Sequence, residues 1–101
     1  MNKFNLNNKT AIVTGGAQGF GLAMTKRFLD SGASVIIWDL DRSAAEETIK
    51  KLNNPKLSSA IIDVTSFEQV STEVEKVTKD KKIDIFINNA GIAGKNTTVW
   101  D

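Results

Sequence analysis

The sequence contains no cysteine and no histidine among its 101 residues. Without cysteine it can form neither a disulfide nor a thiolate nucleophile, and without histidine it lacks the usual metal ligand and proton shuttle. No apolar run reaches the roughly 20 residues that a membrane span needs. A hydrophobic content of 41%, a charged content of 25% and a formal net charge of +1 are typical of a globular domain. We therefore expect a cytoplasmic protein with no metal site and with neither a nucleic-acid nor a membrane partner.

Four short segments have the apolar character of strands. Three are nearly continuous runs of β-branched, aliphatic or aromatic residues, which is typical of strands buried on both faces of a parallel sheet. The third segment along the chain is the weakest, because serines interrupt it. The expected strands are 9–14, 34–39, 57–62 and 83–87.

Between these segments, apolar residues recur at helical spacing and predict three helices. Gly32 suits the end of the first helix. The pairs Ser43 with Glu46 and Ser66 with Gln69 have the spacing of capping boxes at the starts of the second and third. The expected core faces are Phe20, Ala23, Met24, Phe28 and Leu29 for the first helix, Ala45, Ile49 and Leu52 for the second, and Phe67, Val70, Val74 and Val77 for the third.

The element order is therefore βαβαβαβ in a single domain over 1–101. Right-handed crossovers between parallel strands make a doubly wound α/β sheet with strand order 3-2-1-4 the economical arrangement. The segment from Asn88 onward is expected to be loop to the end. In this order the strand at 83–87 would lie at an open edge, so we expect the isolated chain to self-associate.

A glycine-rich turn, Thr14-Gly15-Gly16-Ala17-Gln18-Gly19-Phe20-Gly21, joins the first strand to the first helix. Glycines at such a turn let a pyrophosphate approach the backbone, where free N–H groups and the helix dipole face the anion. The alternative is a plain turn without a ligand. The position directly after the first strand favours nucleotide binding.

Polar residues also follow the other strands. Asp39 ends the second strand, roughly 20 residues after the turn, where a ribose-binding acid is expected. The alternative is that Asp39 or Asp41 only caps the second helix, and for Asp41 we favour the cap. Asp63-Val64 follows the third strand and could meet an adenine ring or form a simple turn. Asn88-Asn89-Ala90-Gly91 follows the fourth strand, at the edge where ligands of such sheets bind.

Taken together, these motifs resemble the short-chain dehydrogenase/reductase family over nearly the whole chain. The resemblance implies a Rossmann-type fold that binds NAD, with the glycine turn around the pyrophosphate, Asp39 at the adenosine ribose and Asp63-Val64 at adenine. Gln18 together with Asp39 is the family's NAD-preferring pattern, and Phe20 stands where an isoleucine is usual. The expected cofactor-binding residues are Gly15, Gln18, Gly19, Phe20, Gly21, Asp39, Leu40, Asp63, Val64, Asn89, Ala90 and Gly91.

The family's catalytic serine and Tyr-x-x-x-Lys pair have no counterpart here, because the sequence contains no tyrosine. No catalytic residue is therefore predicted. The resemblance implies that the chain is the cofactor-binding part of an NAD-dependent oxidoreductase that acts on a small secondary alcohol or ketone. It also implies a homo-oligomer, a dimer or a tetramer. The alternative is a complete nucleotide-binding or partner-binding module without turnover.

Overall fold

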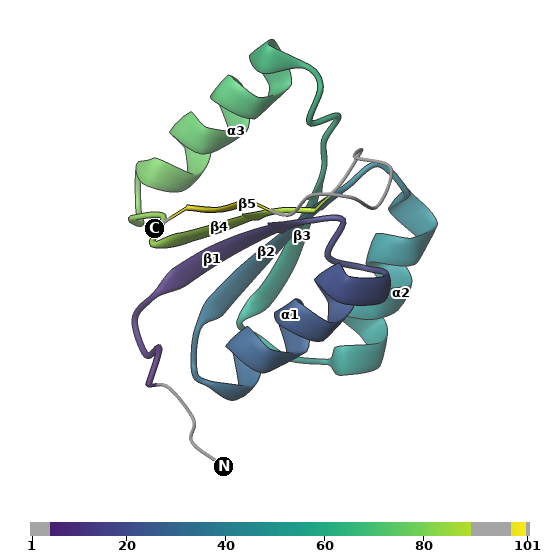
Figure 1. Ribbon diagram of the computed structural model, residues 1–101, viewed down its shortest axis with the longest axis vertical. Helices are drawn as coiled ribbons and strands as arrows, with labels where there is room; N and C mark the ends of the chain where they lie inside the picture. The colour runs from purple at the N-terminus through teal and green to yellow at the C-terminus, as the bar shows by residue number, and fades with distance from the viewer. Residues whose placement is uncertain (1–4, 90–97, 101) are drawn as a thin grey trace.

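Eight elements follow one another in the computed structural model, which describes residues 5–89 and 98–100. They are β1 (Thr10–Thr14), α1 (Gly19–Asp30), β2 (Ser34–Asp39), α2 (Arg42–Leu52), β3 (Leu57–Ile61), α3 (Phe67–Thr78), β4 (Ile85–Asn88) and β5 (Thr98–Trp100). The strands form one sheet in the order β3-β2-β1-β4-β5 (Figure 1). The first four strands are parallel to one another. The predicted alternation and the order 3-2-1-4 are thus confirmed.

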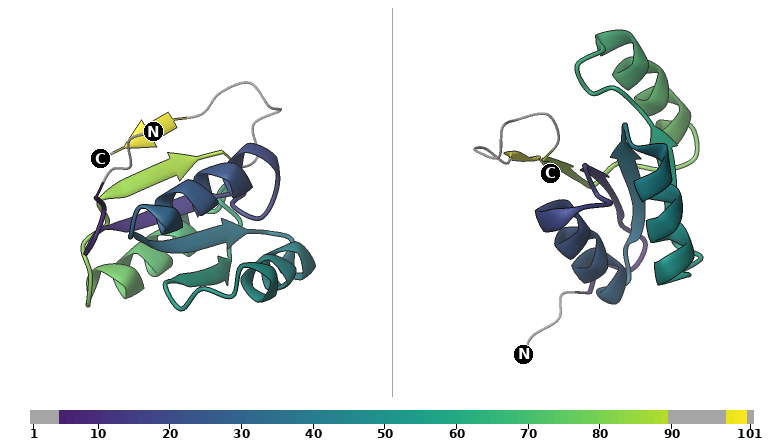
Figure 2. Two further views of the ribbon diagram at one scale, coloured as in Figure 1. Left: turned by 90° about the horizontal axis from the view of Figure 1, so that it is seen from below. Right: turned by 90° about the vertical axis from the view of Figure 1, so that its right-hand side faces the viewer.

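β5 is the element that the sequence pattern did not predict. It pairs antiparallel with β4, with Val99 opposite Ile87, and Figure 2 shows it beside β4 at the edge of the sheet. The expectation of loop from Asn88 to the end is therefore wrong for these three residues, and β4 is not the open edge that we expected. An edge strand has unpaired N–H and C=O groups that can bond to any extended segment within reach. Here β5 pairs with those groups of β4.

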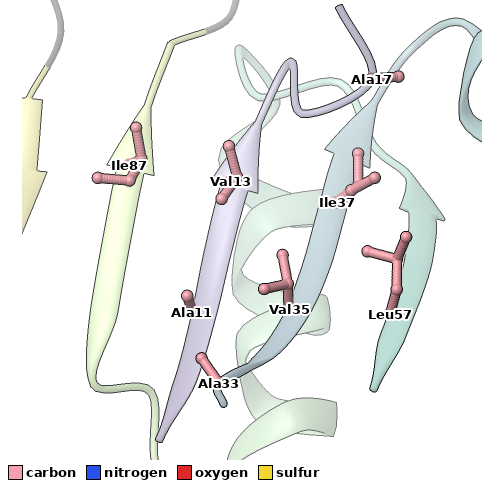
Figure 3. Close-up of a cluster of buried hydrophobic side chains, with 8 residues drawn as sticks. All are labelled: Ala11, Val13, Ala17, Ala33, Val35, Ile37, Leu57 and Ile87. Atoms are coloured by element: carbon pink, nitrogen blue, oxygen red, sulfur yellow. The ribbon is translucent and has the colours of Figure 1, made fainter. Parts of the chain in front are cut away.

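One face of the sheet packs against α1 and α2. Alternate residues of four neighbouring strands point to this face and form a cluster in which every side chain is buried (Figure 3). Met24 and Phe28 of α1 and Ile49 and Leu52 of α2 pack against it. The cluster is Ala11, Val13, Ala17, Ala33, Val35, Ile37, Leu57 and Ile87.

The other face packs against α3, so that α1 and α3 lie on opposite sides of the sheet (Figure 1). Its buried centre is Ile12, Trp38 and Ile62, against which Val70 and Val74 of α3 pack. Trp38 meets Phe86 edge to face, with ring centroids 5.4 Å apart. The indole N–H of Trp38 has no hydrogen-bond partner among the described residues, so packing is what favours the burial of this ring.

The helix starts correct one capping prediction and confirm another. The cap of α2 is Asp41, whose Oδ1 accepts the Ala44 N–H at 3.0 Å. Ser43 lies inside the helix and does not cap it, because the chain already turns into the helix directly after β2. Ser66 caps α3 as predicted, with its Oγ accepting the Gln69 N–H at 3.3 Å, but the Gln69 side chain accepts the Asp63 N–H and does not complete the predicted capping box.

Two aromatic residues expected on core faces are exposed instead. Phe20 is 55% exposed and Phe67 is 85% exposed. Each lies in the first turn of its helix, near the carboxyl ends of the strands, where no layer covers it. Ala23 of α1 is exposed as well. Gly32 follows α1 with φ +99°, as predicted for the left-handed residue that ends a helix.

Candidate functional site

The glycine-rich turn leaves β1 in a conformation that requires glycine at two positions. Gly15 has φ +65° and Gly19 has φ +52°, both in the left-handed region. The Gly15 N–H donates to the Trp38 carbonyl at 2.7 Å, which fixes the start of the turn to β2. The Gln18 N–H donates to the Gly15 carbonyl at 3.4 Å and closes the turn just before α1 begins.

The start of α1 presents backbone N–H groups without a capping side chain. Gln18 occupies the cap position in an extended conformation, and its side chain makes no capping hydrogen bond. The first intrahelical bond runs from the Leu22 N–H to the Gln18 carbonyl. The N–H groups of Gly19, Phe20 and Gly21 therefore have no acceptor within the helix. Such groups, together with the positive end of the helix dipole, form an anion-binding arrangement.

Gly19 and Gly21 are constrained for different reasons. A Cβ on Gly21 would overlap the Gly15 carbonyl oxygen and lie 2.8 Å from its carbonyl carbon, because the helix start packs directly on the turn. A Cβ on Gly19 would meet nothing within 4 Å. The space beside Gly19 is therefore open where a phosphate would need to approach the backbone.

Asp39 ends β2 and Leu40 follows it, on the same edge of the sheet. Oδ1 of Asp39 accepts the Asp41 N–H at 3.0 Å, and its second oxygen has no partner among the described residues. Because Asp41 is the residue that caps α2, Asp39 is not needed as a cap. Leu40 is 65% exposed. Asp39 thus offers a free carboxylate oxygen beside an exposed apolar side chain.

Asp63 follows β3 and is held by its neighbours. Its Oδ1 accepts both the Thr65 hydroxyl at 2.6 Å and the Thr65 N–H at 2.9 Å. These two bonds lower the pKa of Asp63 below its ordinary value, so the group is ionised at neutral pH. Val64 packs against the cluster around Trp38, which leaves Asp63 as the polar member of the pair.

Asn89 is tied to the end of β1. Its N–H donates to Oγ1 of Thr14 at 2.6 Å, and the Thr14 hydroxyl lies 3.2 Å from two acceptors for its proton, the Ile87 carbonyl oxygen and Oδ1 of Asn88. The sequence prediction gave Thr14 no role, although a hydroxyl at the end of a buried strand needs a partner. The predicted site residues Ala90 and Gly91 lie outside the described residues.

The carboxyl ends of β1, β2, β3 and β4 lie at one edge of the sheet, because these strands are parallel. This topology brings the glycine turn, Asp39, Asp63 and Asn89 to that edge. Gly21 and Asn89 lie close together there, since a Cβ on Gly21 would lie 3.0 Å from Nδ2 of Asn89. Within 5–89 and 98–100, no three Asp, Glu, His or Cys residues are grouped to hold a metal. No helix in the same residues is long and apolar enough to cross a membrane.

Comparisons with known proteins agree with this arrangement. The family model described as short chain dehydrogenase matches residues 9–100. The 3-oxoacyl-(acyl-carrier-protein) reductase of Chlamydia trachomatis is 40% identical over 89 residues, which are 84% of this chain and 36% of that protein. The 3alpha-hydroxysteroid dehydrogenase of Mediterraneibacter gnavus is 33% identical over 93 residues, 87% of this chain and 37% of that protein.

A solved structure shows the same fold. The 3-ketoacyl-(acyl-carrier-protein) reductase of Brucella melitensis, complexed with NADH, superposes with a TM-score of 0.77 and 36% sequence identity. The match covers 86% of this chain and 36% of that protein. The chain therefore spans about a third of the length of the relatives that it matches. Since the family match extends over most of the sequence, the chain belongs to the short-chain dehydrogenase/reductase family of oxidoreductases.

Proposed function

We propose that this chain binds NAD and forms the cofactor-binding unit of an oxidoreductase that interconverts a secondary alcohol and a ketone. The observation that carries the proposal is the uncapped start of α1, directly after a glycine turn with open space at Gly19. The Brucella melitensis relative is a complex with NADH, which supports a nicotinamide cofactor. When bound, the cofactor supplies the hydride acceptor or donor at its nicotinamide ring.

The described residues fit the parts of this cofactor one by one. The N–H groups at the start of α1 would hold the pyrophosphate, and the free oxygen of Asp39 would accept hydrogen bonds from the adenosine ribose hydroxyls. Asp63 and Val64 would contact the adenine ring. Asn89, with Ala90 and Gly91 after it, would line the cofactor beyond the pyrophosphate. The chain's part is to bind and orient the cofactor, and we assign no proton-transfer residue to it.

Substrate and assembly belong to the same proposal. The substrate would be a small alcohol or carbonyl compound, the assembly a homodimer or homotetramer, and the location the cytoplasm. The second candidate is a nucleotide-binding module without turnover, which needs only the cofactor contacts that the start of α1 and Asp39 offer. Sequencing the reading frame beyond Asp101 distinguishes the two, because the oxidoreductase requires a serine and a Tyr-x-x-x-Lys pair there and the module does not.

The proposal is tested first at Gly19. We expect Gly19→Val to weaken NAD binding at least tenfold, because valine disfavours the left-handed backbone and its side chain would fill the space left for the pyrophosphate. Isothermal titration of the chain with NAD measures the effect. Lys50→Val is the control, since Lys50 is exposed on α2. Unchanged affinity in a folded Gly19→Val chain would contradict a phosphate site at this turn.

The choice between NAD and NADP is tested at Asp39. The 2′-phosphate of NADP would face this carboxylate, and neither Gln18 nor Leu40 offers a positive charge. A charge-assisted hydrogen bond contributes about 1.5–3 kcal/mol, so NAD should bind roughly tenfold to a hundredfold more tightly than NADP. Asp39→Asn should reduce this preference. Glu47→Gln makes an equal change of charge at an exposed position of α2 and should leave the preference unchanged. Equal or tighter binding of NADP to the unmodified chain would exclude this role for Asp39.

A further inference from the structure

The turn between β3 and α3 fixes Asp63 at three points. The Asp63 N–H donates to Oε1 of Gln69 at 3.0 Å. The Asp63 carbonyl accepts the Ser66 N–H at 2.9 Å. Oδ1 of its carboxylate accepts the Thr65 N–H at 2.9 Å and the Thr65 hydroxyl at 2.6 Å. The side chains of Thr65 and Gln69, together with the backbone N–H groups of Thr65 and Ser66, therefore hold both the backbone of Asp63 and the rotation of its carboxylate.

Capping of α3 does not account for these bonds. Ser66 already caps the helix, because its Oγ accepts the Gln69 N–H. In a capping box, the Gln69 side chain would bond back to the Ser66 N–H. Here that N–H donates to Asp63 instead, and the Gln69 side chain reaches past it to the Asp63 N–H. The side chains of Thr65 and Gln69 therefore form hydrogen bonds with Asp63 and not with the N–H groups at the start of α3.

The second carboxylate oxygen, Oδ2, has no hydrogen-bond partner among the described residues. The χ2 torsion of an aspartate is broad, so an unrestrained carboxylate samples many orientations. With Oδ1 bound twice by Thr65, Oδ2 becomes an acceptor of fixed orientation. An ionised carboxylate accepts hydrogen bonds and donates none, so this position favours a donor and disfavours an acceptor.

The geometry points to Thr65 and Gln69 as positioning residues that hold Oδ2 of Asp63 for the amino group of the purine ring, so that the site selects an amino-purine over an oxo-purine. The inference rests on the proposed function, which places adenine at Asp63. Adenine presents an N–H donor at its six-position. Hypoxanthine presents a carbonyl oxygen there, which would face the carboxylate with no hydrogen between them.

The test compares NAD with nicotinamide hypoxanthine dinucleotide, which has a carbonyl at the six-position and a hydrogen on N1, by titration calorimetry on the 101-residue chain. We expect NAD to bind about tenfold more tightly. Thr65→Val keeps the size and the backbone N–H but removes the hydroxyl, and it should reduce the ratio of the two affinities to about threefold or less. Thr65→Ser restores a hydroxyl and should restore the ratio. Gln69→Leu should lower the ratio as Thr65→Val does.

The same substitution at Thr72, an exposed threonine of α3, is the matched control and should leave the ratio unchanged. A loss of affinity in Thr65→Val that is equal for both dinucleotides would show a structural role and overturn the inference. Equal binding of both dinucleotides by the unmodified chain would overturn the inference while leaving the proposed function intact. Binding of neither would overturn the proposed function, and the inference with it.

Discussion

Replacing Gly21 with alanine is expected to lower the free energy of unfolding by about 3 kcal/mol, the upper end of the usual effect of overpacking. The new Cβ would overlap the Gly15 carbonyl oxygen and lie 2.8 Å from the carbonyl carbon. These are backbone atoms of a turn that is itself bonded to β2 through the Gly15 N–H, so they cannot rotate away. Urea unfolding followed by circular dichroism measures the change.

Gly16→Ala is the matched control for this substitution. A Cβ on Gly16 would lie 3.0 Å from side-chain atoms of Ile37 and Thr25, which can shift by a few tenths of an ångström. We expect a loss of about 1 kcal/mol, at the lower end of the overpacking range. Equal losses in Gly16→Ala and Gly21→Ala would show that the backbone approach at Gly21 is looser than the structure indicates.

Val99→Pro is expected to increase the association of the chain through the edge of β4. Proline has no N–H and is poorly tolerated within paired strands, so it should detach β5 from β4. The outer edge of β4 would then offer unpaired backbone groups between Ile85 and Ile87 to a second chain. Size-exclusion chromatography with light scattering, at several protein concentrations, measures the shift.

Val99→Thr provides the comparison, because threonine is also β-branched and retains its N–H. It should elute as the unmodified chain does. A Val99→Pro chain that associates no more than the unmodified chain would mean that β5 is not what protects the edge.

The parallel part of the sheet was predictable because its signals are local and strong. Ala11 to Val13 and Val35 to Trp38 are continuous apolar runs, and strands of this kind are buried on both faces. The strand order then follows from two rules: crossovers between parallel strands are right-handed, and consecutive strands tend to be neighbours. β5 could not be predicted, since three residues carry no periodicity and their pairing depends on which edge they reach.

The starts of the helices were also predictable only in part. Asp41 and Ser43 can both cap a helix, and only the path of the chain after β2 decides between them. Phe20 fits the helical spacing of a core face, but its position in the first turn of α1 leaves it exposed. Helical spacing predicts the side of a helix on which a residue lies. It does not predict how many turns of the helix the sheet covers, because that depends on the tertiary packing.

Of the candidate site, the sequence indicated the residues that would face a ligand. The glycine turn and Asp39 were found because their spacing has a physical reason, and their cofactor contacts remain predictions. The residues that hold the site together were not found. Thr14 and Thr65 act through hydrogen bonds to Asn89 and Asp63, and a threonine near a strand end has no distinctive spacing.

The bond between Thr14 and Asn89 joins residues 75 positions apart in the chain, which has a consequence for folding kinetics. β1 can pair with β2 after one short crossover, but it can pair with β4 only by closing a far longer loop, which costs more chain entropy unless the intervening chain is already ordered. We therefore expect β4 to dock late, after the rate-limiting step. A ligand that touches both the glycine turn and Asn89 would then slow unfolding and leave the folding rate unchanged.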